Sequence, residues 1–134
     1  MNYHASGTFQ VKLTPLEAYA KAEIPNLARM SIDKQFDGDL HGAGKGEMLS
    51  AVTAVKGSAG YVALEQVTGM LHGKSGTFIL QHTGTMTRGE PRLSVTVVPD
   101  SGTGQLTGLT GKLAIKIAEG KHSYEFDYTL GDAG

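Results

Sequence analysis

Three short segments with similarly spaced glycines decide how this chain folds: Gly38–Gly42 (GDLHG), Gly69–Gly73 (GMLHG) and, in a shorter form, Gly108–Gly111 (GLTG). Each lies between runs rich in β-branched and aromatic residues, which favour strands. Glycine lets a strand bend sharply and lets two backbones approach closely, because it has no side chain. The recurrence of the pattern therefore predicts one strand-and-turn unit used repeatedly, as in an antiparallel sheet that curls until it closes.

The composition indicates one domain without cysteine. The chain has 134 residues, which is enough to bury a core without covalent or metal cross-links. With 12 Lys and Arg against 13 Asp and Glu, the net charge is −1 and the basic residues are dispersed. We therefore expect no nucleic-acid partner and no binding to an anionic membrane surface. The absence of cysteine excludes disulfides, thiolate metal ligands and cysteine nucleophiles.

Apolar and polar residues alternate with a period of two along most of the chain, which predicts strands. Met30, Ile32, Lys34 and Phe36, for example, fall on one face of an expected strand. The strand spacing is typical of an all-β barrel or sandwich. Because several such runs are apolar on both faces, we favour an eight-stranded antiparallel barrel, whose outer side can also pack against a helix or another subunit. The expected strands cover residues 5–13, 28–36, 46–55, 61–71, 76–87, 92–98, 113–118 and 122–130.

The stretch near residues 15–24 departs from this alternation. Thr14 is followed by Pro15 and Glu17, the order of a helix N-cap, a first-turn proline and a capping-box acid, and Pro25 ends the stretch. A short helix and an irregular arm both fit this sequence.

The chain ends set the expected domain limits and location. We expect a single barrel domain over residues 1–130 and a disordered tail over residues 131–134. The first residues lack the basic and apolar regions of a secretory signal. No apolar run approaches the ~18 residues of a transmembrane helix, so a cytoplasmic protein is the expectation.

Segments throughout the chain resemble a known family. Residues 102–111 (GTGQLTGLTG) resemble the glycine-spaced strand pair of the allene oxide cyclase and dirigent barrel proteins. With five further segments, the chain is similar over nearly its whole length to a bacterial family of uncharacterised small proteins in the allene oxide cyclase-like group. The further segments are FDGDL (36–40), GEML (46–49), SGTF (75–78), HTGTM (82–86) and YEFDYTL (124–130).

The resemblance implies an eight-stranded antiparallel barrel with a central cavity. Relatives on this barrel cyclise or isomerise reactive organic molecules without metals or organic cofactors. They hold a flexible substrate in one conformation while a few polar groups steer charge or a proton. No catalytic motif of the plant enzymes is matched here residue by residue, so no residue role is carried over, and a shared fold does not by itself supply a function.

Three ionisable residues within apolar strands are candidates for general acid or base chemistry. Glu47 opens an otherwise apolar strand; it is either lumenal with a raised pKa or a solvated, salt-bridged glutamate. Glu65 shares a face of mixed polarity with Tyr61, a face that suits either a cavity or solvent. His82 shares a face with Phe78 and is the best candidate for proton transfer, the alternative being a core or interface histidine bonded to a carbonyl.

Aromatic residues are the candidates for lining a ligand pocket. Tyr124, Phe126 and Tyr128 form a stripe on one face of the last expected strand. Such stripes usually belong to the core. In a lumen the same stripe would form an apolar wall with two phenolic hydroxyls, and Phe78 and Tyr61 would extend it.

His41 and His72 occupy equivalent positions in the first two glycine units. A shared metal site would need a third ligand at a recognisable spacing, which the sequence does not offer. A common turn architecture explains the equivalence better, so we expect neither a metal nor a cofactor.

Two functions follow as hypotheses. The first is a barrel that binds a small apolar or amphipathic molecule in its lumen, with cofactor-free cyclase or isomerase activity as its enzymatic form. The second is a packed structural or interaction module without catalysis. A homo-oligomer is expected in either case, because both strand faces carry apolar residues. An internal pocket of about 300 Å³ or more with convergent polar groups favours the first hypothesis.

Overall fold

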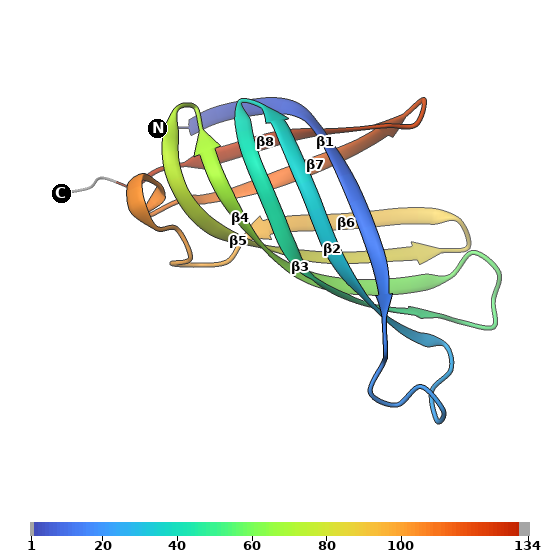
Figure 1. Ribbon diagram of the computed structural model, residues 1–134. Helices are drawn as coiled ribbons and strands as arrows, with labels where there is room; N and C mark the ends of the chain where they lie inside the picture. Colours follow the sequence, from blue (N-terminus) through green and yellow to red (C-terminus); the bar gives the residue numbers. More distant parts are fainter. Residues whose placement is uncertain (1, 132–134) are drawn as a thin grey trace.

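The computed structural model describes residues 2–131, which form eight antiparallel strands that follow one another around a closed barrel (Figure 1). Each strand pairs with its neighbours in the sequence, and β1 pairs with β8 to close the barrel. The predicted all-β barrel is therefore confirmed. The elements are β1 (Asn2–Leu16), β2 (Leu27–Gly38), β3 (Leu40–Val52), β4 (Ala59–Leu71), β5 (Lys74–Thr87), β6 (Glu90–Val97), the short helix η1 (Gly104–Leu106), β7 (Thr110–Ala118) and β8 (Lys121–Thr129).

The first two glycine units bend the barrel wall where β3 and β4 meet. Gly42 pairs directly with Gly69. A side chain on Gly42 would place its Cβ 2.3 Å from the carbonyl oxygen of Thr68, so only glycine allows the two backbones to approach this closely. The third unit is different, because Gly108 lies in the turn after η1 with a positive φ of 85°.

The stretch between β1 and β2 is an irregular arm. β1 continues through Pro15 to Leu16, and a series of turns then leads to β2. Proline fits in β1 because the ladder with β8 has already ended at Phe9, which leaves one edge of the strand unpaired. Of the expected tail, Gly131 donates its N–H to the carbonyl of Gly108, and residues 132–134 lie outside the described part of the chain.

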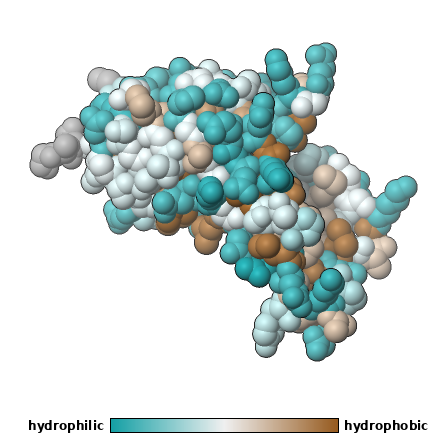
Figure 2. All heavy atoms as spheres, in the orientation of Figure 1, coloured by the Kyte–Doolittle hydropathy of each residue, from teal (hydrophilic) through white to brown (hydrophobic). Residues whose placement is uncertain are grey.

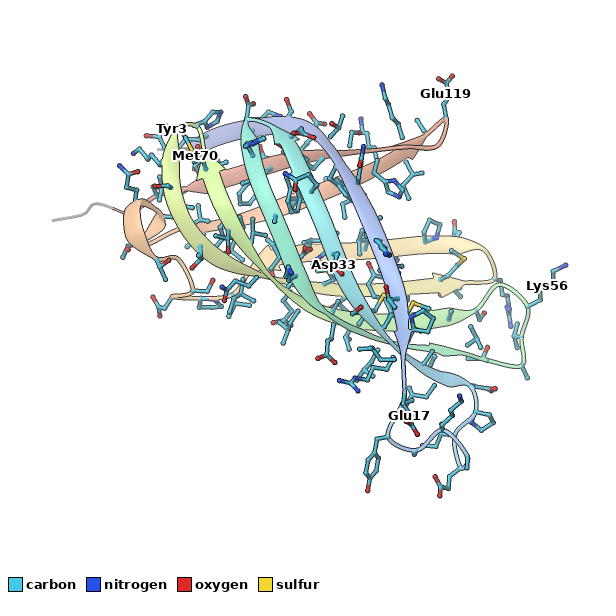
Figure 3. The ribbon with its side chains drawn as sticks, in the orientation of Figure 1. Tyr3, Glu17, Asp33, Lys56, Met70 and Glu119 are labelled. Atoms are coloured by element: carbon cyan, nitrogen blue, oxygen red, sulfur yellow. The ribbon has the colours of Figure 1, made fainter. Side chains whose placement is uncertain are left out.

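One half of the barrel is filled by aromatic side chains. Phe36, Phe78, Tyr124 and Phe126 are each at most 1% exposed. The rings of Phe78 and Phe126 stack with centroids 6.0 Å apart, and Phe36 meets Tyr124 edge to face. We call this half the closed end. Figure 3 shows Tyr3 and Met70 at this end of the barrel.

The other half is open between β6 and β7. The β1–β8 ladder ends at Phe9 and His122, and β6 and β7 share one pair, Thr96 with Lys112. Beyond these points the β7–β8 hairpin diverges from β5 and β6 (Figure 1), and Figure 3 shows Glu119 at the tip of that hairpin.

The opening exposes apolar side chains of the inner face. Leu93, for example, lies on the same face of β6 as buried Val95 but is 43% exposed. Figure 2 shows the molecule notched on this side, with hydrophobic side chains in the notch. We call this inner-face surface the mouth; its half-exposed apolar members are Leu13, Met86 and Leu93.

Candidate functional site

Three ionisable side chains meet inside the barrel, between the closed end and the mouth. Lys34 from β2 donates a hydrogen bond from Nζ to Glu65 Oε1 of β4 at 2.8 Å. His82 from β5 bonds to the same oxygen through Nε2 at 2.6 Å. All three side chains are buried, the Glu65 carboxylate completely. A lysine, a glutamate and a histidine thus form one compact network in an otherwise apolar interior.

The strand alternation places these side chains on the inner face. Lys34 lies between buried Ile32 and Phe36 in the alternation of β2. Glu65 and His82 take the same inner positions in β4 and β5. The three residues therefore converge because each lies on the buried face of its strand.

Gly44 of β3 makes room for the carboxylate. A Cβ added to Gly44 would lie 2.5 Å from Oε2 of Glu65. This second oxygen is buried and has no hydrogen-bond partner among the described residues. Leaving such an acceptor unpaired costs about 1–3 kcal/mol, so the network is not optimised for stability alone.

Glu65 is ionised at neutral pH. Burial is the largest influence and on its own raises the pKa of Glu65. The hydrogen bond from His82 and the charge of Lys34 act in the opposite direction and together outweigh it, so the pKa lies below its usual value. The carboxylate can therefore only accept hydrogen bonds, which makes Nε2 of His82 the donor.

This assignment leaves Nδ1 as the ring nitrogen of His82 that Glu65 does not hold. Nδ1 has no partner within residues 2–131, and it is not among the fully buried polar atoms that lack one. The His82 side chain as a whole is 4% exposed. A carboxylate that fixes one imidazole nitrogen and leaves the other free is the arrangement of a general base held in one tautomer.

Tyr61 lies next to this pair, toward the mouth. Tyr61 pairs with Gly84, one step along the β4–β5 ladder from Ala63 and His82. Its ring packs directly over Gly84. A Cβ added to Gly84 would lie 2.3 Å from Cε1 of Tyr61, so the ring needs a glycine at this position. Burial, and to a lesser extent the charge of Glu65, raises the pKa of Tyr61, so the hydroxyl stays protonated.

Lys34 is the member of the network that sequence reasoning missed as a site residue. Its ammonium lies 4.9 Å from the centroid of the Phe9 ring and 5.8 Å from that of Phe36, in the range of a cation–π contact. The signal was present in the alternation, because Lys34 shares its face with Ile32 and Phe36.

Glu47 lies apart from Glu65 and His82, the other two candidates for acid or base chemistry. Its side chain is on the outer face of β3, where Arg29 bonds to it at 2.7 Å. The salt-bridged alternative for this residue is the one observed. The pair lies in an outer groove of about 1000 Å³ that is also lined by Ala18, Leu49 and Leu64. Figure 3 shows Glu17, another lining residue, on the arm beside it.

The predicted aromatic lining residues divide between the two halves. Phe78, Tyr124, Phe126 and Tyr128 are buried at the closed end, where they belong to the core cluster. Tyr61 is half-buried beside His82. The structure thus brings together Glu65, His82 and Tyr61.

The tyrosine hydroxyls of the closed end are engaged in the core. The Tyr124 hydroxyl accepts a hydrogen bond from the amide of Leu40 at 2.8 Å and lies 3.0 Å from two carbonyl oxygens. The Tyr128 hydroxyl lies 2.5 Å from Nδ1 of His72.

The two histidines of the glycine units are separately engaged. His72 also lies 3.6 Å from Asp39, whereas His41 faces Asp37 at 3.3 Å on the surface. Within residues 2–131 no group of three or more His, Asp or Glu side chains is placed to hold a metal ion. No helix in that range is long and apolar enough to cross a membrane.

Comparison with known proteins places the chain in a family. The model of a family described as "Protein of unknown function (DUF3224)" matches residues 5–128. The chain belongs to the DUF3224 family. A crystal structure of a DUF3224 protein of unknown function from Shewanella oneidensis MR-1 is 54% identical, with a TM-score of 0.94 over 99% of this chain and 100% of the other. No curated protein matches the chain. DUF3224 membership thus agrees with the resemblance to a bacterial family of uncharacterised proteins and leaves the function to be argued from the site.

Proposed function

We propose that this DUF3224 protein binds a small, uncharged apolar or amphipathic molecule in the mouth, with Nδ1 of His82 as the polar anchor. The observation that carries the proposal is the arrangement of His82, whose Nε2 is held by Glu65 while Nδ1 bonds to none of the described residues. Half-exposed Leu13, Met86 and Leu93 supply the apolar surface around it.

A purely structural role accounts poorly for the network. Burying an ion pair such as Lys34 and Glu65 is costly, and apolar residues of similar volume commonly serve stability as well or better. One carboxylate oxygen also remains unpaired. A network that costs stability and leaves one imidazole nitrogen free is better explained by a ligand that uses this nitrogen.

The test compares two probes that differ in one hydrogen-bond donor. 2-Naphthol can donate its hydroxyl to Nδ1, whereas 2-methoxynaphthalene cannot. We expect the protein to bind 2-naphthol about tenfold more tightly, the effect of one good hydrogen bond. His82→Met should abolish this preference, and Leu93→Trp, which fills the mouth, should weaken both probes. Fluorescence titration measures both affinities.

His41→Gln is the matched control, because His41 is an exposed histidine on another part of the barrel. It should leave both affinities unchanged, and thermal unfolding confirms that each variant is folded. Equal binding of both probes by the unaltered protein, or no binding at all, would overturn the proposal.

A second candidate is a homo-oligomeric interaction module, favoured by the outer groove. Leu49, Val62 and Leu64 on the outer face of β3 and β4 are 45%, 52% and 55% exposed. A second copy of the chain would cover this surface. Native mass spectrometry of the purified protein measures the number of subunits. Val62→Glu should dissociate the assembly, and a monomer in both proteins would exclude this candidate.

A further inference from the structure

The proposed binding site contains a second free polar atom, the hydroxyl of Tyr61. It has no hydrogen-bond partner within residues 2–131, and Tyr61 is half-buried. Tyr61 and His82 lie on the same face of the β4–β5 ladder, in pairs that are two residues apart along the strands. Side chains at such diagonal positions are within reach of one another or of one shared small ligand.

The two atoms have complementary chemistry. When the imidazole carries one proton, Nδ1 of His82 is an acceptor, because Glu65 holds that proton on Nε2. The Tyr61 hydroxyl is a neutral donor, since burial and the charge of Glu65 both raise its pKa. Gly84 fixes the direction of the ring by leaving space under it. The site therefore offers a positioned base and a positioned hydrogen-bond donor.

The charges of the network also restrict the ligand. Lys34 and Glu65 already neutralise each other at 2.8 Å, and the half-exposed side chains of the mouth are apolar. An ionised ligand would lose its hydration without gaining a counter-charge, which is costly. The surface suits an uncharged molecule with a single polar group beside an acidic C–H bond.

We infer that the site acts on uncharged, apolar carbonyl compounds and moves a proton between two of their carbons, with His82 as the base and Tyr61 as the donor to the carbonyl oxygen. The inference rests on the proposed binding of a ligand in the mouth. It names the substrate class as ketones, and their conjugated relatives, that carry a C–H bond next to the carbonyl.

The proposed step balances without an oxidant or a cofactor. Nδ1 of His82 removes a proton from the carbon next to the carbonyl, and the C–H electron pair forms an enolate. The enolate oxygen accepts a hydrogen bond from the Tyr61 hydroxyl, which stabilises the new negative charge. Glu65 stabilises the imidazolium formed at His82. The imidazolium then donates its proton to a conjugated carbon, which completes an isomerisation. Alternatively it exchanges that proton with solvent and returns the solvent proton to the same carbon, which completes an exchange.

The experiment uses 2-tetralone in deuterated water, where nuclear magnetic resonance follows the loss of the protons next to the carbonyl. The protein should accelerate exchange beyond the buffer rate. His82→Gln keeps a donor for Glu65 but has no base, and it should reduce the acceleration by about 100-fold or more. Tyr61→Phe should reduce it by about 100-fold with little change in 2-tetralone affinity. Tyr19→Phe is the matched control, because Tyr19 is fully exposed on the arm, and should exchange at the unaltered rate.

The outcomes separate this inference from the proposed function. If 2-naphthol binds with its preference intact and 2-tetralone displaces it without accelerated exchange, the inference is wrong and the binding proposal stands. If neither probe binds, both are wrong. If Tyr61→Phe exchanges as fast as the unaltered protein while His82→Gln does not, Tyr61 has no part in the step.

Discussion

The two ends of this barrel use the same residue types for opposite purposes. At the closed end the hydroxyls of Tyr124 and Tyr128 are held by the Leu40 backbone and by His72. Near the mouth, the hydroxyl of Tyr61 and Nδ1 of His82 have no partner within residues 2–131. Tyrosine and histidine side chains therefore form hydrogen bonds within the core at one end, and at the other end they have polar atoms that can bind a ligand.

The difference between the two ends arises from how far the β1–β8 and β6–β7 ladders extend along the barrel. Ladders on both sides of β1 bring aromatic rings together at the closed end. Where β6 leaves β7, inner-face side chains such as Leu93 lose their neighbours from across the barrel. The distance of an inner-face residue from this opening thus decides whether its side chain is packed in the core or can contact a ligand.

The largest expected effect is the loss of a closed-end ring. Phe126 is fully buried and contacts Phe78 and Tyr128, so Phe126→Ala should lower the free energy of unfolding by about 4 kcal/mol. Leu93→Ala, on the same inner face but at the mouth, should cost less than about 1 kcal/mol, because Leu93 is already half-exposed. Urea unfolding measures both. Equal losses would show that the mouth is packed as tightly as the closed end.

The next effect separates two glutamates. Glu65→Gln removes the charge opposite buried Lys34 and should cost about 3 kcal/mol, because it leaves a buried ammonium without its counter-ion. Glu47→Gln removes an exposed ion pair with Arg29 and should leave the stability almost unchanged. The same urea titration checks this comparison. A similar loss for both would mean that the inner network does not depend on its ion pair.

These glutamates also show how much the sequence could predict. The alternation predicts which residues share a face, and for β5 it also indicates which face is inside, since Phe78, Leu80 and His82 stand opposite more polar neighbours. In β3 both faces are apolar, because the outer groove buries part of the second one. The environment of Glu47 could therefore not be predicted from its strand alone.

Other features depend on distant parts of the chain. The eight strands follow from local patterns, whereas the opening between β6 and β7 depends on how many pairs form between strands, which no local pattern specifies. The same holds for Lys34, whose contact with Glu65 joins residues 31 positions apart in the sequence. The sequence shows that Lys34 lies in an apolar stripe, but it does not show that Glu65 is its partner.

A smaller effect compares two tyrosine hydroxyls directly. Tyr124→Phe removes the acceptor for the buried amide of Leu40 and should cost about 1.5 kcal/mol, since that amide loses its partner. Tyr61→Phe should be close to neutral, because the Tyr61 hydroxyl bonds to none of the described residues. Thermal and urea unfolding measure both variants. A clear loss for Tyr61→Phe would indicate a structural role for its hydroxyl and would weaken its assignment to a ligand.

The smallest expected effect is the acid dependence of stability. The pKa of Glu65 lies below its ordinary value of 4.5, so the unfolded chain takes up this proton first as the pH falls. The stabilisation by Glu65 is therefore complete above about pH 4.5 and is lost as the pH falls through the folded pKa. The groups that face Glu65 are Lys34, His82 and Tyr61.

Salt distinguishes this contribution from that of the exposed glutamate. The pKa of Glu47 is also lowered, chiefly by its hydrogen bond with Arg29, but that pair lies on the surface and is screened by salt. In high salt, the unaltered protein and Glu47→Gln should therefore lose stability with the same acid slope, whereas Glu65→Gln should show a flatter one. Urea unfolding over a pH series measures the slopes. If Glu65→Gln retains the full slope, the carboxylate is not the group that titrates, and the tautomer assigned to His82 loses its basis, because that assignment requires an ionised Glu65.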